Sequence, residues 1–231
     1  EKKSVTIIEI MGRHAGWLTG AAALARKYTG DNPLLIYLPE TDFDVEDFLQ
    51  KVNTSFEKNC NVVVCVSEGI HDKNGTFICE YDNAAGIDAF GHKMLAGCGK
   101  YLENLVRSRL GVKARSVELN VSQRCSGSML SETDQQEAIL AGEFGVQAAL
   151  NGETGKMIAF KRQSNVPYSM KCTLEDVDAI CNEEKTVPVE WITSDGSDVT
   201  DAFIRYARPL IQGTVEVPVG EDGLPAFVYR K

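Results

Sequence analysis

The stretch "NVVVCV" at positions 61–66 constrains the fold most, because its apolar side chains are consecutive and do not alternate with polar ones. Successive side chains of a strand point to opposite faces, so a strand over this run is apolar on both faces. Strands of this kind belong to parallel sheets that helices cover on each side. The run therefore predicts an α/β fold.

The same pattern recurs along the chain. Strands are expected at 5–10, 34–38, 61–66, 115–121 and 156–161. Helices are expected at 16–28, 44–57, 97–110, 132–151, 174–181 and 198–206. Alternating strands and helices indicate parallel-sheet layers with helices on both faces and right-handed crossovers. The segment 69–92 interrupts the pattern and reads as a hairpin or insertion. After about residue 163 five prolines loosen the pattern, which predicts an irregular tail that wraps the core without adding a sheet.

The length, net charge and composition of the chain argue against some classes of partner. The 231 residues suffice for one large domain or two small lobes, and the net charge of −9 argues against nucleic acid as the main partner. No apolar run approaches the roughly 18 residues of a membrane span, and no signal-peptide pattern opens the chain. The seven cysteines form no CxxC pair, which favours reduced thiols in a cytoplasmic protein. The histidines, among them His71 and His92, lack metal-ligand spacing, so no metal site is expected.

Three predicted strands end in side chains that could bind a ligand, and ligands of open α/β sheets bind beyond the carboxyl ends of strands. In chain order these ends carry Met11-Gly12-Arg13, Glu68 and Arg124. Guanidinium groups suit a phosphate and a carboxylate suits hydroxyl groups, so this set would fit a phosphorylated sugar. No P-loop and no GxGxxG follow a strand, so the residues alone indicate a sugar-phosphate half-site.

Each of these side chains also has a plain structural interpretation. Arg13 could cap its turn, Glu68 could be a solvated loop acid, and Arg124 could form a salt bridge near a helix start. Arg115 begins its strand, where a basic residue is unremarkable. His14 is expected to support the turn or to stack on Trp17. The aromatic residues on predicted helical faces are expected in the core; they are Phe48, Phe56, Tyr101 and Phe144.

Three motifs resemble the phosphofructokinase family in order and spacing, over about residues 4–162. They are "VTIIEIMGRHAGWLTGAAALAR", "VVVCVSEGI" and "ARSVELNVSQR". The tail, with "EKTVPVEWI" and "DVTDAFIRYARPLI", is most similar to the pyrophosphate-dependent branch. The resemblance implies that the fructose 6-phosphate contacts fall on Met11, Gly12, Arg13, Glu68 and Arg124. It also implies that Arg115 reaches the sugar phosphate bound to a neighbouring subunit of a homo-oligomer.

The chain departs from the family pattern at two positions. Ser4 stands where many members have an arginine, and Val121 stands where members often have His or Tyr. These departures leave open whether either position contacts the phosphate.

The resemblance implies a division of labour along the chain. Residues 1–123 would form a sugar-phosphate-binding lobe, and residues 124–231 would pack on the donor-side lobe. The donor loop and the catalytic aspartate of the family precede the motifs found here. This chain would thus hold no catalytic residue except Arg13 as a charge stabiliser, and would be inactive alone. The ligands of Mg²⁺ would also lie outside it.

The implied reaction is the glycolytic transfer of a phosphoryl group, with pyrophosphate as the expected donor, to the 1-hydroxyl of fructose 6-phosphate. Two alternatives stay open: an ATP-dependent 6-phosphofructokinase, and a non-catalytic sugar-phosphate-sensing subunit of the same fold. A sugar-binding receptor domain is a weaker third reading, because no signal peptide supports it. Nucleic acid and membrane are not expected as partners.

Overall fold

The computed structural model describes residues 2–82 and 97–226, and these divide into two compact units. The first unit comprises Glu1–Gln123 together with Glu184–Ile204, and the second comprises Arg124–Glu183 together with Arg205–Lys231. We call residues 184–204 the strap. Sequence analysis assigned the strap to the second part of the chain, whereas it packs with the first unit.

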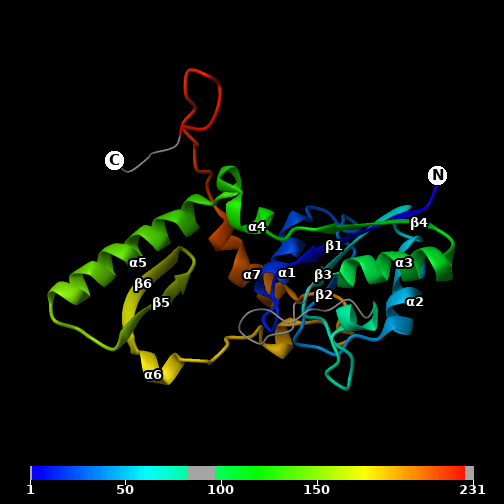
Figure 1. The fold of residues 1–231 in the computed structure, drawn as a ribbon, viewed down its shortest axis with the longest axis horizontal. Coiled ribbons are helices and arrows are strands. Elements are labelled where there is room, and N and C mark those ends of the chain that lie inside the picture. Colours follow the sequence, from blue (N-terminus) through cyan, green and yellow to red (C-terminus); the bar gives the residue numbers. More distant parts are fainter. Residues whose placement is uncertain (1, 83–96, 227–231) are drawn as a thin grey trace. The chain divides into compact units, whose positions relative to one another are not determined.

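The first unit is built on a four-stranded parallel sheet with the order β2-β3-β1-β4 (Figure 1). Its strands are β1 (Ser4–Ile10), β2 (Leu35–Tyr37), β3 (Asn61–Ser67) and β4 (Lys113–Glu118). Ser4 of β1 pairs with Asn61 on one side and with Lys113 on the other, so β1 lies between β3 and β4. The carboxyl ends of these three strands therefore meet at one edge of the sheet.

Helices α2 (Val45–Ser55) and α3 (Cys98–Leu110) cover one face of the sheet. Phe48 of α2 and Leu102 of α3 are fully buried against Val5, Ile7 and other strand residues. Helix α2 begins where the Asp44 side chain accepts a hydrogen bond from the amide of Asp47. Burying side chains of this size stabilises the sheet by roughly 1.5–3 kcal/mol each.

The other face carries α1 (Trp17–Ala21), the 3₁₀ turn η1 (Ala22–Ala25) and the strap, which includes the 3₁₀ turn η4 (Val189–Trp191) and the start of α7 (Asp201–Ala207). The Phe203 ring lies directly against Gly20, where an added Cβ would come within 2.5 Å of it. The strap also contacts the edge strand β2, because the amide of Ile36 donates to the carbonyl of Ser197 (2.8 Å). Helices on both faces of a parallel sheet confirm the predicted fold class.

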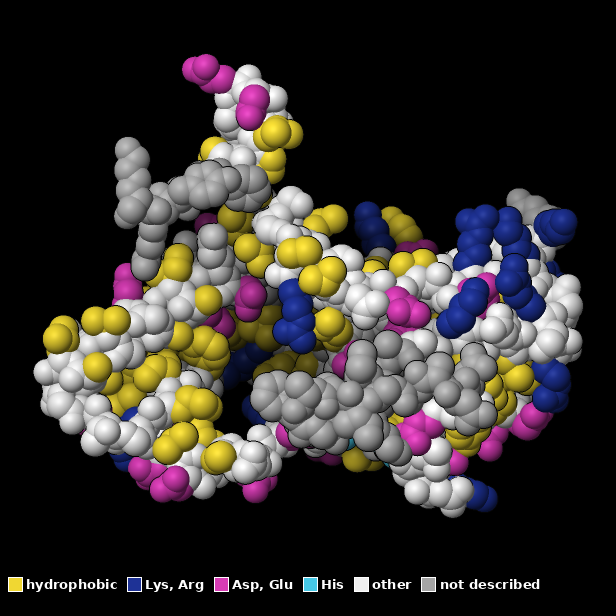
Figure 2. Space-filling view, viewed as in Figure 1, with side chains coloured by type: hydrophobic (Ala, Val, Ile, Leu, Met, Phe, Trp, Pro, Cys, Tyr) yellow, Lys and Arg dark blue, Asp and Glu magenta, His cyan; other side chains and the backbone are white. Residues whose placement is uncertain are grey.

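The second unit contains α5 (Glu132–Leu150) and an antiparallel hairpin of β5 (Lys156–Asn165) and β6 (Tyr168–Asp176). Its short elements are η3 (Gly127–Met129), α6 (Val177–Ile180) and η5 (Arg208–Ile211). The unit boundary falls within the single-turn helix α4 (Ser122–Cys125). Apolar side chains gather on the surface of α5 (Figure 2). The most exposed of them are Ile139, Leu140, Val146 and Leu150.

Several expectations for the later part of the chain were wrong. The tail after residue 163 adds a strand, β6, and only 177–180 of the predicted helix 174–181 is helical. Apolar and polar residues alternate from Tyr168 to Glu175, which is a strand signal that the proline at 167 obscured. The strand from residue 156 pairs with β6 and not with the parallel sheet.

Other corrections are local. The helix expected at 16–28 ends early, because Arg26 has an extended backbone. Phe48 is buried as expected and Phe56 and Tyr101 are partly buried, whereas Phe144 is 37% exposed. In the segment 69–92, His71 and Phe77 form an antiparallel bridge before the 3₁₀ turn η2 (Ile78–Asp82), and the remainder, with His92, lies outside the described residues. Across the described ranges, no helix is both long enough and apolar enough to span a membrane.

Candidate functional site

The turn 11–16 follows the central strand β1, and neighbouring loops hold its first residues by hydrogen bonds. The amide of Met11 donates to Gln123 Oε1 (2.7 Å), and the amide of Gly12 donates to Glu68 Oε1 (3.3 Å). The amide of Glu68 in turn donates to the carbonyl of Ile10 (2.9 Å). The loops after β1, β3 and β4 are thereby joined at one place, as ligand binding at a strand edge requires.

Close backbone approach in this region leaves no room for side chains at two glycines. A Cβ at Gly69 would lie 1.7 Å from the carbonyl oxygen of Arg13, well inside contact distance. Gly12 has a φ of +152°, and a Cβ there would lie 2.7 Å from the carbonyl oxygen of Ala15. The Ser67 hydroxyl donates to the Gly12 carbonyl and accepts from the amide of Gly69 (3.3 Å). The turn and the loop after β3 are thus packed as one body.

Arg13 lies in the middle of this turn and is half-buried. Within the described part of the chain, no carboxylate forms an ion pair with its guanidinium. Three other arginines of the first unit form ion pairs within that unit. Arg26 pairs with Asp198, Arg107 with Glu103 and Arg109 with Glu46. A half-buried guanidinium without such a partner suits an anionic ligand.

Glu68 has a structural role as well as a possible ligand role. Its Oε1 braces the turn through Gly12, and its Oε2 accepts no hydrogen bond from the described residues. The second oxygen is therefore available to a hydroxyl group.

The structure gathers four of the six predicted site residues, namely Met11, Gly12, Arg13 and Glu68. Arg115 is exposed and pairs in register with Thr6, five residues before the turn. At about 3.3 Å per residue it is roughly 16 Å from the turn along the strand. Arg124 is the first residue of the second unit. Ser4 lies at the opposite end of β1, where its hydroxyl donates to Asn61 (2.7 Å).

Sequence analysis passed over Glu9, the last residue but one of β1. Its side chain is 3% exposed and accepts hydrogen bonds from the amides of Gly99 (2.7 Å) and Gly97 (3.2 Å) at the start of α3. Burial raises the pKa of Glu9, although these two amides oppose the shift. Glu9 therefore ties α3 to the central strand. Gln123, Ser67 and Glu40 were also missed, because only the fold reveals which loops they join.

His14 does not stack on Trp17. The His14 ring lies beside Phe77, with centroids 6.1 Å apart, whereas the Trp17 ring stacks on Phe203 at 5.9 Å. The reason is that Trp17 faces the strap, to which its indole nitrogen donates a hydrogen bond at the Lys185 carbonyl (2.6 Å).

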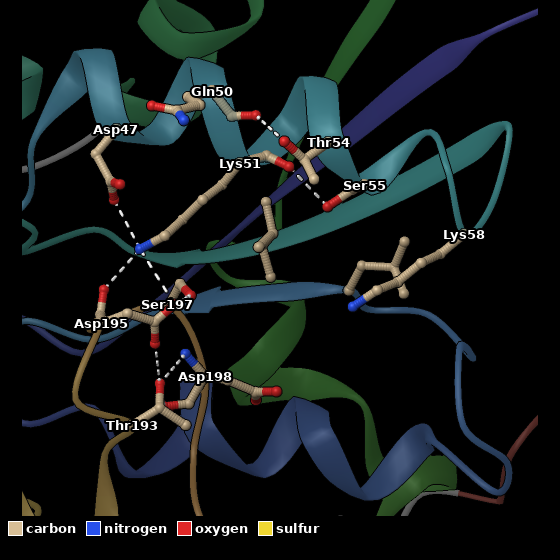
Figure 3. A pocket seen from close by; sticks show the side chains of 12 residues that line it. Asp47, Gln50, Lys51, Thr54, Ser55, Lys58, Thr193, Asp195, Ser197 and Asp198 are labelled. Carbon is tan, nitrogen blue, oxygen red and sulfur yellow. Dashed lines mark hydrogen bonds and ion pairs between the residues drawn. The ribbon is translucent and has the colours of Figure 1, made fainter.

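A separate hollow of about 460 Å³ lies between α2 and the strap (Figure 3). Its Lys51 ammonium is bound to Asp47 (2.7 Å) and to Asp195 (3.3 Å). Burial alone would raise the pKa of Asp195, but hydrogen bonds from Ser197 and Thr193, together with the charge of Lys51, outweigh it and lower the pKa. This lysine is occupied within the protein, so the hollow is a weaker candidate than the turn.

Neither a metal-binding cluster nor a disulfide occurs among the residues that the structure describes. Among the described residues, no three His, Cys, Asp or Glu side chains come together in a way that could hold a metal ion. All seven cysteines are described, and none forms a disulfide.

Comparison with known proteins agrees with this geometry. The family model for phosphofructokinase matches residues 2–150. The chain is 38% identical over 221 residues to the pyrophosphate–fructose 6-phosphate 1-phosphotransferase of Halomonas elongata, covering 96% of this chain and 52% of that protein. It is also 38% identical to the enzyme of the same name from Xanthomonas campestris pv. campestris, covering 98% and 54%.

Among solved structures, the pyrophosphate-dependent phosphofructokinase of Nitrosospira multiformis superposes with a TM-score of 0.84 at 32% identity. That match covers 98% of this chain and 52% of the solved chain. The chain thus spans about half the length of these relatives.

A parallel sheet with helices on both faces, whose central strand leads into a Met-Gly-Arg turn, places the chain in the α/β class. The chain belongs to the phosphofructokinase family.

Proposed function

We propose that this chain supplies the sugar-phosphate half of an enzyme that transfers a phosphoryl group from pyrophosphate to the 1-hydroxyl of fructose 6-phosphate. The observation that carries the proposal is Arg13, a half-buried guanidinium with no carboxylate partner among the described residues. Relatives named for the same reaction support it, because they match almost the whole chain. Arg13 would bind the phosphate and neutralise its charge.

The neighbouring residues would orient the sugar. The backbone of Met11 and Gly12 would approach the ligand closely, and the free oxygen of Glu68 would accept a hydrogen bond from a sugar hydroxyl. Arg124, which follows Gln123 in the sequence, would add a second guanidinium. Arg115, on the edge strand and roughly 16 Å from its own turn, would serve the site of a neighbouring copy in a homo-oligomer.

The second unit would pack on the donor-side part of the enzyme. The exposed apolar side chains of α5 support this, because a monomeric protein rarely leaves several large apolar residues of one helix in water. The catalytic base and the donor loop would come from that part, and the chain alone would be inactive.

Mg²⁺ would be held outside this chain. The described residues contain no cluster of carboxylates suited to it, so no step is assigned to the metal here. When bound, such an ion would neutralise the charge of the donor phosphates. The thiols without disulfides favour the cytoplasm as the site of action.

The test is Arg13→Ala in the full-length protein, assayed with pyrophosphate and with ATP as alternative donors. We expect the KM for fructose 6-phosphate to rise by about 30-fold or more, because loss of one partner of a desolvated charge pair costs roughly 2–5 kcal/mol. The KM for the donor should stay unchanged. The matched control is Arg109→Ala, which removes an arginine that pairs with Glu46 on the surface.

An unchanged KM for fructose 6-phosphate in the Arg13→Ala protein would contradict the proposal and would mean that Arg13 has only a structural role in the turn. Tight fructose 6-phosphate binding without turnover on either donor would instead favour the alternative of a sensing subunit. Turnover with ATP but not with pyrophosphate would favour an ATP-dependent enzyme.

A further inference from the structure

The far end of the turn 11–16 is held by a carboxylate that none of the predicted motifs contains. The amide of Gly16 donates to Glu40 Oε1 (2.8 Å), and so does the amide of Val187 in the strap (2.8 Å). The other oxygen, Oε2, is shielded from solvent and accepts no hydrogen bond from the described residues. It lies against Gly16, where a Cβ would come within 2.7 Å of it. The carboxylate is therefore enclosed between the turn and the strap.

The strap is itself fixed to the first unit at several points away from the turn. Asp198 receives two hydrogen bonds from Arg26 Nη1 (2.7 and 2.9 Å), and Lys51 Nζ donates to the Asp195 carbonyl (2.7 Å; Figure 3). At its start, the carbonyl of Lys185 accepts the indole hydrogen bond of Trp17, the residue after Gly16. The strap thus offers a rigid support on which Glu40 can position the turn.

We infer that Glu40 is a positioning residue that couples the strap to the turn carrying Arg13. The turn is held at both ends: Gln123 and Glu68 fix the amides of Met11 and Gly12, and Glu40 fixes the amide of Gly16. Between these points, the Ala15 carbonyl lies against Gly12 and the Arg13 carbonyl against Gly69. Release of Gly16 would let the guanidinium of Arg13 leave its binding position.

This inference rests on the proposed function for the identity of the ligand, fructose 6-phosphate. Its structural part does not, because hydrogen exchange reports the state of the turn without any ligand. The two can therefore fail separately.

The experiment compares Glu40→Ala, Glu40→Asp and Glu40→Gln in the full-length protein. Hydrogen–deuterium exchange of the amides in 11–16 and KM and kcat for fructose 6-phosphate are measured. Glu40→Ala leaves two backbone donors without their acceptor, so we expect about tenfold faster exchange and about a tenfold higher sugar KM, with kcat changed less. Glu40→Gln keeps an acceptor oxygen and should stay within about threefold of wild type. Glu40→Asp, one methylene shorter, replaces the alanine variant if that variant does not fold.

The matched control is Asp31→Ala. Asp31 Oδ2 also accepts two backbone hydrogen bonds, from Lys27 (2.9 Å) and Tyr28 (2.7 Å), but in a different turn. The Asp31→Ala variant should therefore show wild-type hydrogen exchange in residues 11–16 and a wild-type KM for the sugar.

Wild-type exchange of 11–16 in both Glu40→Ala and Glu40→Asp would overturn the inference. Faster exchange with an unchanged sugar KM would overturn it as well, because Glu40 would then be purely structural. If the wild-type protein does not use fructose 6-phosphate, the proposed function fails, and the exchange data alone decide whether Glu40 holds the turn.

Discussion

At the scale of single residues, Glu9 is a buried acid of β1 that contacts residues at the start of α3 and next to β4. It receives two amide hydrogen bonds at the start of α3, and its backbone carbonyl accepts from Leu119 after β4. Burial is the largest influence on its pKa, which lies above the ordinary value of 4.5. Among the described residues, the titratable groups that act on it are Cys98, which lowers the pKa through a hydrogen bond, and Glu118, whose charge raises it.

The raised pKa of Glu9 predicts how stability depends on pH. The unfolded chain releases this proton near pH 4.5, whereas the folded chain retains it to higher pH. Glu9 therefore makes the free energy of unfolding fall as pH rises from the unfolded pKa through the folded pKa, and its effect is constant above that range. We expect Glu9→Gln to remove this component, so that its stability relative to wild type is greater at pH 7 than at pH 4.

Urea unfolding at a series of pH values measures this difference. Glu57→Gln, which changes an exposed glutamate just after α2 that forms no ion pair with the described residues, is the control and should follow the wild-type pH curve. Parallel curves for wild type and Glu9→Gln would show that Glu9 does not titrate differently in the two states.

The candidate site residues could be proposed from the sequence, whereas the residues that hold them in place could not. Met11, Gly12, Arg13 and Glu68 stand at strand ends, and strand ends are readable from apolar runs. Gln123 and Glu40 act through contacts between loops that are far apart in sequence, and no local sequence pattern predicts such contacts. The same holds for Gly69, whose backbone meets that of Arg13.

At the scale of elements, the parallel strands were predictable because their apolar runs are nearly continuous. Hairpin strand β6 was not predicted, since a proline preceded it and its alternation was read as a loose tail. The strap has neither a strong helical nor a strong strand period. Its place is set by tertiary contacts such as the bond between Ile36 and Ser197, which local propensity does not encode.

The docking of the strap predicts a spectroscopic signature. The chain has two tryptophans, Trp17 and Trp191, and both rings lie in one cluster with Phe203. Phe203→Ala should destabilise the protein by about 3–5 kcal/mol, the usual result of emptying a buried aromatic site. It should also change the tryptophan emission of the native state, because it removes the ring on which Trp17 stacks.

Phe48→Ala is the matched control for this prediction. Phe48 is as buried as Phe203 but packs on the opposite face of the sheet, so it should lower stability to a similar degree with native emission unchanged. Urea unfolding followed by fluorescence measures both quantities. Wild-type emission in folded Phe203→Ala would mean that the strap is not docked on Trp17.

At the scale of the whole molecule, the proposal that Arg115 serves the site of a neighbouring copy can be tested. Its guanidinium is on the edge strand β4 and not at its own turn. We expect Arg115→Ala in the full-length protein to weaken fructose 6-phosphate binding and to leave donor affinity unchanged. When mixed with Arg13→Ala subunits it should regain some activity, because a mixed dimer contains one site with both arginines intact.

Subunit exchange is verified by mass spectrometry of the mixed oligomer before activity is measured. Lys113→Ala, also exposed on β4, is the control and should retain the wild-type KM for the sugar. Two inactive variants that stay inactive in a verified mixed oligomer would indicate that one chain builds each site.

The division of the molecule was only partly accessible from sequence. Prolines and weak periodicity marked the region after residue 163 as different, but they did not reveal that the chain returns to the first unit at residue 184. Such a return depends on which surfaces the earlier elements leave open, and that is a property of the assembled fold.

The central place of β1 has a consequence for how the chain reaches this fold. β1 is the first strand in sequence, yet both of its partners come much later, beginning at Asn61 and Lys113. Pairing over such separations requires large loops to close before any contact compensates for the lost entropy, so folding is expected to be slow. During synthesis at about 5–20 residues per second, β3 would be made several seconds after β1, so Val5 and Ile7 would have no strand partner during that time. Until β3 and β4 are made, β1 has two unpaired edges, and unpaired strand edges are prone to aggregation.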